Sequence, residues 1–395
     1  MEKTASKSIL HNIRILDFSW VLAGPYATRL LADFGAEVIK IQPLMDEEQD
    51  SFSRAYYNAW NRNKLGITLN LNRPEGVKIA RKLAKISDVV VENFSSRVMA
   101  NWGLEYPVLQ KEKPEIIFLS LSLMGHSGPW KHFSGFGPTV QAFSSVTYLT
   151  AYPGQPPLGI GYSYADHIAA LYASLAILGA LEYRRKTGKG QYIDLSQTEA
   201  MTSLLADAII DYALRGKTAE PVGNSSNQSA PYGVYPCQGT DRWCAITVTT
   251  DREWKGFKRA LGNPDWAEEE KFATLDRRLR NMQALDRLVE DWTKKHPAEE
   301  VMAVLQKEKV PAGVVQNAAD IARDPQLKER GFFVELGHPT LGKTISDASP
   351  IRLSRSSAEY CRAAPARGQD NDYVYRELLG MKDVEIERLR IEGVI

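Results

Sequence analysis

Asp166 is the acidic residue whose place in the chain is best suited to chemistry. It closes the sequence Ser163-Tyr-Ala-Asp166, an S-x-x-D pattern that marks helix N-termini, and a small-residue, apolar run follows it. With Ser163 as N-cap, Asp166 is a first-turn acid that the helix dipole favours. A carboxylate there also lies among free backbone N–H groups, which can stabilise an oxyanion if the carboxylate attacks a carbonyl. The spacing alone favours the capping role.

Motifs of several other enzyme classes are missing or incomplete. The segment Gly159-Ile-Gly161-Tyr-Ser-Tyr164 lacks the third glycine of a nicotinamide-binding GxGxxG fingerprint. Gly188-Lys189 suggests a phosphate-binding loop, but Gly190 replaces the Ser or Thr that would hold magnesium. Neither HExxH nor GxSxG occurs. We therefore expect no dehydrogenase, ATPase, zinc hydrolase or α/β-hydrolase, and no metal site.

Composition narrows the class of protein further. Lys and Arg total 49 against 48 Asp and Glu, so a formal charge of +1 gives no overall field to attract nucleic acid or an anionic membrane. Three cysteines without a CxxC pair are too few for a disulfide framework and fit a reducing cytoplasm. Residues 1–10 contain no long apolar segment typical of a secretory signal. The apolar stretch 165–181 is short for a bilayer and begins with Asp166 and His167, which favours a buried helix.

The first half of the chain alternates strand-like and helix-like segments. Ile13–Phe18 and Val38–Ile41 read as strands around a helix at Tyr26–Phe34, and a second helix at Pro74–Ile86 precedes strands at 88–92 and 116–120. This pattern predicts an α/β fold with a Rossmann-like parallel sheet. After residue 222 the parallel pattern stops, and charged amphipathic helices with the strand Trp243–Thr249 indicate a smaller α+β domain.

A chain of 395 residues exceeds what one core typically supports, so we expect two domains. We place the N-terminal part of a large α/β domain at 1–222 and the small domain at 223–330, because residues 222–231 have the Asn, Ser and Gly content of a linker. Periodicity does not assign the segment 331–395 to either domain.

The segment Ile15–Lys40 closely resembles the class III CoA-transferase family, also called the CaiB/BaiF or formyl-CoA transferase family. Further family landmarks follow in order at Asn61–Lys64, Asp88–Phe94, Gly128-Pro129, Asp166 and Thr187–Gln191. The resemblance implies an interlocked dimer in which both ends of each chain contribute to one large domain, so that 331–395 returns to it. It also reverses the reading of Asp166, because family members carry their nucleophilic aspartate at this landmark.

What the resemblance implies is transfer of CoA from an acyl-CoA to a free carboxylic acid. Asp166 would form an aspartyl-acyl anhydride and then an aspartyl-CoA thioester, with no metal or redox cofactor beyond CoA as substrate. Some relatives shield these intermediates with a run of glycines in the second domain, and this chain has none.

The family's CoA pocket maps onto four segments of this chain. These are Leu22 and Ala23; Leu69, Asn70, Leu71 and Asn72; Asn93, Phe94 and Ser95; and Phe133, Ser134, Gly135 and Phe136. Pro43 and Asn101 stand where some relatives use arginine near the CoA phosphates. The neighbouring cations are alternative phosphate ligands, although such residues are usually solvated surface charges: Lys40, Lys64, Arg97 and Lys131.

Two other functions stay open from the sequence. An α-methylacyl-CoA racemase needs a His–Asp relay, and this chain reads Gly135-Phe136-Gly137 where racemases carry Gly-His-Asp. The second alternative function is that of a non-catalytic subunit paired with an active homologue, since some family members are built from two related chains. The partner expected is thus a second copy or a related subunit, and neither nucleic acid nor a membrane.

Substrate identity rests on weaker signals. The aromatic-rich segment 130–148 and the missing glycine run favour a bulky acceptor, an aryl- or alkylsuccinate, with succinyl-CoA as donor. Trp20 and Phe136 are either acyl-pocket or core aromatics, Tyr162 and Tyr164 are weak candidates for orienting a substrate carboxylate, and His167 is expected to be a packing residue.

Overall fold

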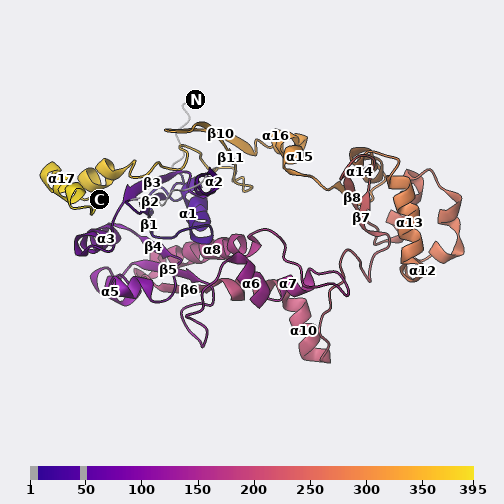
Figure 1. The fold of residues 1–395 in the computed structure, drawn as a ribbon, viewed down its shortest axis with the longest axis horizontal. Coiled ribbons are helices and arrows are strands. Elements are labelled where there is room, and N and C mark those ends of the chain that lie inside the picture. The colour runs from indigo at the N-terminus through magenta and orange to yellow at the C-terminus, as the bar shows by residue number, and fades with distance from the viewer. Residues whose placement is uncertain (1–7, 45–50) are drawn as a thin grey trace. The chain divides into compact units, whose positions relative to one another are not determined.

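The structure is a computed structural model that describes residues 8–44 and 51–395. It divides into two compact units (Figure 1). The first comprises Met1–Thr147, Gly159–Thr218 and Gln326–Ile395, and the second Tyr148–Leu158 with Ala219–Pro325. The chain therefore leaves the first unit and returns to it at its C-terminal end.

The first unit is built on a six-stranded parallel sheet in the order β3-β2-β1-β4-β5-β6. Its strands are β1 (Arg14–Asp17), β2 (Glu37–Gln42), β3 (Lys64–Thr68), β4 (Val89–Glu92), β5 (Ile117–Ser122) and β6 (Tyr192–Ser196). The strand order reverses between β1 and β4, and ligands of doubly wound sheets bind at the carboxyl edge at such a point. The predicted Rossmann-like sheet is confirmed.

Alternate side chains of the strands point to opposite faces of the sheet, and a hydrophobic core lies on each face. On one face, Leu16 and Val90 pack with residues of α3 (Pro74–Ile86) and α5 (Tyr106–Glu112). On the other, Ile15 and Val89 pack with residues of α1 (Ala23–Asp33) and α8 (Tyr164–Thr187). Each fully buried Leu, Ile or Val side chain contributes about 1.5–3 kcal/mol, so burial on both faces fixes these helices.

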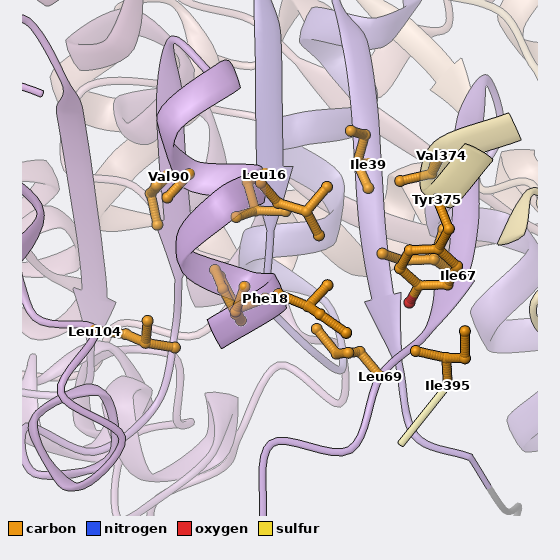
Figure 2. Close-up of a cluster of buried hydrophobic side chains, with 14 of the residues drawn as sticks. Leu16, Phe18, Ile39, Ile67, Leu69, Val90, Leu104, Val374, Tyr375 and Ile395 are labelled. Carbon is orange, nitrogen blue, oxygen red and sulfur yellow. The ribbon is translucent and has the colours of Figure 1, made fainter. Parts of the chain in front are cut away.

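The C-terminal segment completes the first of these cores. Figure 2 shows Val374, Tyr375 and Ile395 among side chains of the strands, beside Ile39 and Ile67. These residues come from the π-helical turn Tyr373–Leu378 and from the chain end after α17 (Asp383–Ile391). The Tyr375 hydroxyl also donates a hydrogen bond to the Thr68 carbonyl at the end of β3.

A buried ionic cluster attaches the hairpin of β10 (Phe333–His338) and β11 (Gly342–Asp347) to the first unit. Arg62 Nη2 lies 2.6 Å from Asp33 Oδ2, and its Nη1 lies 3.1 Å from Asp347 Oδ1. Arg29 Nη2 adds a contact of 2.7 Å to Asp347 Oδ2. Because both guanidinium groups are buried, the two aspartates are their necessary counter-ions.

Helix α8 carries apolar residues on two faces. Its Ala169, Ala173 and Ile177 are buried against the sheet, as expected for a core helix. By length and composition this 24-residue helix could also cross a membrane, and 39% of its most apolar window is buried. Its packing on the sheet accounts for the buried face.

The second unit is a small α+β fold. Strands β7 (Tyr232–Pro236), β8 (Trp243–Thr247) and β9 (Ala312–Val314) form an antiparallel sheet. Its core contains side chains from α11 (Asp251–Ala260), α13 (Met282–Thr293) and α14 (Ala298–Lys307). Thr250 and Glu253 close a reciprocal capping box at the start of α11.

Candidate active site

Asp166 is the third residue of α8, the crossover helix from β5 to β6. Because that crossover connects parallel strands, its N-terminus lies at the carboxyl edge of the sheet. Ser163 is the N-cap as predicted, but its side chain caps no N–H of the helix and instead hydrogen-bonds the Tyr56 side chain. The predicted capping box is thus correct in position and wrong in its hydrogen bond. The N-terminus of α8 therefore has no capping box in which Asp166 would take part.

The Asp166 side chain is half-buried and has few hydrogen-bond partners. Burial raises its pKa to about 6, while its own backbone N–H and the side chain of Gln197 oppose that rise. Gln197 is the first residue of α9 (Gln197–Thr202), directly after β6. A carboxylate in such a site is more basic than usual yet still mostly ionised at neutral pH.

Gly137 lies directly beside the Asp166 carboxylate. It is the first residue of α6 (Gly137–Phe143), and a Cβ atom there would lie 2.6 Å from Asp166 Oδ2. A side chain at 137 would therefore displace the carboxylate. The acid of a racemase's Gly-His-Asp signature therefore has no room at position 137.

His167 belongs to an aromatic cluster and points away from Asp166, as its neighbouring position on a helix requires. Its Nδ1 lies 2.8 Å from the Ser163 carbonyl oxygen, and its Nε2 lies 2.9 Å from the Tyr162 hydroxyl. The rings of Tyr26 and Trp60 lie 5.1 Å away. These contacts confirm a packing role and fix the first turn of α8, where Asp166 is located.

The loops after β1 and β4 are joined across the switch point of the sheet. Trp20 N donates to Asn93 Oδ1 and Asn93 Nδ2 donates to the Trp20 carbonyl, both at 2.8 Å. Val21, which directly follows Trp20 in the loop after β1, has a φ of 62°, a left-handed conformation that is costly for a β-branched residue. The doubled hydrogen bond helps to hold this strained turn at the edge where a ligand would bind.

A buried ion cluster lies beside the loop that follows β1. The Asp17 carboxylate contacts Lys40 Nζ at 3.2 Å and Lys64 Nζ at 3.0 Å, and it accepts a hydrogen bond from the Ser19 backbone N–H. Burial raises the pKa of Asp17, but the two ammonium groups outweigh it and hold that pKa well below its usual range. Lys40 and Lys64 are 4% and 0% exposed, so the expectation that they contact CoA phosphates is wrong. Arg97 and Lys131 are exposed.

The four segments assigned to CoA all follow strands of the parallel sheet, after β1, β3, β4 and β5, and therefore share its carboxyl edge. Their exposure differs. The side chains of Leu22, Ala23 and Leu69 are buried in the fold. Asn70 is tied to the chain end, since its N–H donates to the Val394 carbonyl. Exposed or half-buried are Leu71, Asn72, Asn93, Phe94, Ser95, Phe133, Ser134, Gly135 and Phe136.

Aromatic side chains are unusually accessible around this edge. Trp20 is 56% exposed and Phe136 is 64% exposed, which excludes the alternative that they are core residues. Trp130 and Phe133 stack with ring centres 5.7 Å apart. Tyr162 and Tyr164 are also exposed, close in sequence to Asp166. In the described part of the chain, no group of three His, Cys, Asp or Glu residues could hold a metal ion.

Some residues of the site gave no sequence signal. Tyr56 and Gln197 lie 110 and 31 positions from Asp166, and only the tertiary fold brings them near it. The sequence shows Gly137 as a departure from the racemase motif but does not reveal its closeness to Asp166. No sequence pattern points to Glu92 and His126, although their side chains face each other at 3.7 Å.

Comparison with known proteins agrees with this arrangement. The sequence profile of CoA-transferase family III matches residues 10–371. Succinyl-CoA–D-citramalate CoA-transferase of Chloroflexus aurantiacus is 32% identical, covering 98% of both chains. The alpha subunit of succinyl-CoA–L-malate CoA-transferase from Chloroflexus aurantiacus is 34% identical, covering 98% of this chain and 92% of its own. A crystal structure of a CaiB/BaiF family protein from Brucella suis superposes with a TM-score of 0.87 at 30% identity, covering 94% of this chain and 100% of the other. Spanning nearly all of the sequence and the fold, these matches show that the chain belongs to CoA-transferase family III.

Proposed function

We propose that this CoA-transferase moves CoA from succinyl-CoA to a substituted succinate through covalent intermediates on Asp166. The observation that carries the proposal is the Asp166 carboxylate itself. It lies at the carboxyl edge of the sheet, is half-buried, and is held by one side-chain amide with its pKa raised to about 6. A basic, weakly solvated carboxylate that stays ionised at neutral pH suits a nucleophile.

The first half of the reaction loads CoA onto the enzyme. An Asp166 oxygen attacks the thioester carbonyl, a C–O bond forms, the C–S bond breaks, and CoA leaves as thiolate. The thiolate then attacks Cγ of Asp166 in the resulting anhydride. A C–S bond forms, the bond from Cγ to the bridging oxygen breaks, and succinate departs as a carboxylate.

The second half returns CoA to the acceptor. The acceptor carboxylate attacks the aspartyl thioester and expels the thiolate, which then attacks the acceptor side of the new anhydride and releases the Asp166 carboxylate. No proton is gained or lost in the whole sequence. A general acid–base residue is therefore unnecessary, which agrees with Gly137 in the place of a racemase acid.

The substrate class is inferred from the relatives. L-malate and D-citramalate are both succinates that carry small substituents, and the names of the two relatives give succinyl-CoA as the donor. A hydroxyl- or methyl-bearing succinate is the acceptor we favour. The acid panel also includes the aryl- and alkylsuccinates expected from the aromatic-rich segment 130–148 and the missing glycine run.

The test is a CoA-exchange assay of the purified chain with succinyl-CoA and a panel of acids, with the thioester products weighed by mass spectrometry. We expect malate- or citramalate-like acids to be converted, and Asp166→Ala to lower the rate on the order of 10³-fold or more. Asp207→Ala is the matched control, since Asp207 is an exposed first-turn acid of α10 (Ala206–Arg215). Retention of full activity in Asp166→Ala would contradict the proposal.

We further infer that the working form is a dimer, either of this chain or with a related subunit. Exposed apolar side chains line the outer faces of two helices, at Leu171, Leu175 and Leu178 of α8 and at Ile209, Ile210, Tyr212 and Leu214 of α10. Apolar surface of this extent usually marks a protein interface. Light scattering of the purified chain, combined with the exchange assay, distinguishes a homodimer from a heterodimer. An active dimer of this chain alone would exclude an obligatory second subunit.

A further inference from the structure

Glu92 and His126 form an acid–base pair, with Glu92 buried and His126 partly buried, for which the proposed reaction has no use. Glu92 is the last residue of β4 and is 0% exposed, and His126 lies in the loop after β5. Glu92 Oε1 and His126 Nε2 face each other at 3.7 Å. Neither atom has a hydrogen-bond partner within residues 8–44 and 51–395. Such groups are costly to bury, so a pair retained in this state needs an explanation.

The remaining contacts of the pair fix its orientation. The Tyr192 hydroxyl of β6 lies 3.0 Å from His126 Nδ1, so with Tyr192 as donor the imidazole proton lies on Nε2 and faces Glu92. The His126 backbone N–H donates to Asp194 Oδ1 at 2.8 Å. Ser120 of β5 contributes a hydrogen bond to Glu92. The pair, located where β4 ends, thus contacts residues of β5 and β6.

The same pair is attached directly to the loop assigned to CoA. The other Glu92 oxygen, Oε2, accepts the Phe94 backbone N–H at 2.8 Å, and the intervening Asn93 is bonded to Trp20 across the switch point. Further out, Ser96 Oγ donates to the Lys131 carbonyl at 3.2 Å. These hydrogen bonds therefore connect the loops after β1, β4 and β5, and His126 adjoins them through its 3.7 Å approach to Glu92.

We propose that Glu92 and His126 are positioning residues that hold the loops after β4 and β5 in the geometry that binds the CoA thioester. This inference rests on the proposed function, because it concerns the donor side of that same site. Neither residue would contact the reacting atoms. Loss of the pair should weaken the binding of CoA and its thioesters and leave the chemical step on bound substrate nearly unchanged.

Burial places both groups where their charge is sensitive to pH. Burial raises the pKa of Glu92 to about 7, with Asp194 adding to the rise and hydrogen bonds from Ser120 and Phe94 opposing it. Burial lowers the pKa of His126, and Asp194 opposes that change. The titratable groups that face the pair are thus Asp194 and Tyr192.

The experiment measures calorimetric binding of free CoA in the Asp166→Ala background, where no covalent step occurs. We expect the Kd to rise about 10-fold in Glu92→Leu, which removes the acceptor of the Phe94 N–H, and in His126→Leu, which removes the ring that orients Glu92. The Kd should stay within about twofold in Glu92→Gln, which keeps an acceptor for the Phe94 N–H. His296→Leu is the matched control, since His296 makes an exposed pair with Glu300 at 3.1 Å in the second unit.

In otherwise native enzyme, the KM for succinyl-CoA should rise in the two leucine variants while kcat and the KM for the acceptor acid stay within about threefold. Unchanged CoA affinity in His126→Leu, or an equal loss in His296→Leu, would overturn the inference. If a leucine variant does not fold, Tyr192→Phe provides the test of the inference. It removes only the hydroxyl that bonds His126 and should still raise the Kd for CoA measurably. Failure of the proposed function appears separately, as an absence of CoA exchange in the unmodified chain.

Discussion

Gly137 leaves the space that the Asp166 carboxylate occupies, since a Cβ at residue 137 would lie 2.6 Å from Asp166 Oδ2. Real Cβ atoms do not approach an oxygen so closely, so this glycine is required by its neighbour and not by its own backbone. One missing side chain both admits the carboxylate and excludes the acid–base residue of a racemase.

Gly137→Ala should therefore reduce CoA exchange strongly, by about 10-fold or more, because the carboxylate must rotate or shift to avoid the methyl group. The measurement is kcat for exchange at saturating substrates, with thermal unfolding to verify the fold. Gly179→Ala in α8 is the control, because a Cβ there meets nothing within 4 Å. Equal activity of the two alanine variants would show that the contact is unimportant.

The rate should follow the ionisation of Asp166. Because burial raises its pKa to about 6, the attacking carboxylate is lost as the pH falls below that value, and kcat/KM for succinyl-CoA should rise from pH 5 to a plateau above pH 7. Gln197→Leu removes a hydrogen bond that favours the charged form, so the midpoint should move to higher pH. A midpoint near 4 in the unmodified enzyme would contradict a buried nucleophile.

Glu92 should make stability fall as the pH rises. Its pKa in the folded chain is about 7 against 4.5 for a free side chain, so the folded state binds the proton more tightly. Below pH 4.5 the group is protonated in both states and has no effect. Between pH 4.5 and 7 the unfolded chain ionises first, and up to about 3 kcal/mol of stability is lost. Relative to the unmodified chain, Glu92→Gln should gain stability from pH 5 to pH 8 in urea unfolding; a constant difference would contradict this.

Arg62 should be important for the stability of the first unit. Arg62→Met leaves the buried Asp33 carboxylate without its counter-ion, and breaking such a pair costs about 3–5 kcal/mol. Urea denaturation measures the loss. The double variant Arg62→Met with Asp33→Asn removes both charges and should recover part of it. If the double variant is as unstable as the sum of the single variants, the pair is not coupled.

The strands and helices of the first unit were predictable where apolar periodicity is strong. Ile13–Phe18 and Val38–Ile41 became β1 and β2 within one residue at each end, and Tyr26–Phe34 lies within one residue of the C-terminal end of α1. The apolar stretch 165–181, expected to be a buried helix, lies within α8. Strand β3 gave no such signal, because it begins with Lys64, whose burial depends on Asp17 from another strand.

The site was predictable only in part for a related reason. Asp166 was found through a local pattern and a family resemblance, and both act over short stretches of sequence. Its neighbours Gln197 and Tyr56 come from other elements, and the buried state of Lys40 depends on a carboxylate 23 positions away. Local patterns report on single elements, whereas pockets are formed by contacts between them.

The most direct measurement is the mass of the enzyme after incubation with succinyl-CoA in the absence of any acceptor. We expect an adduct equal to CoA minus one water on the peptide that contains Asp166. It should be absent from Asp166→Ala and should be lost when an acceptor acid is added. An active enzyme that accumulates no such adduct, or carries CoA on another residue, would contradict the central role of Asp166.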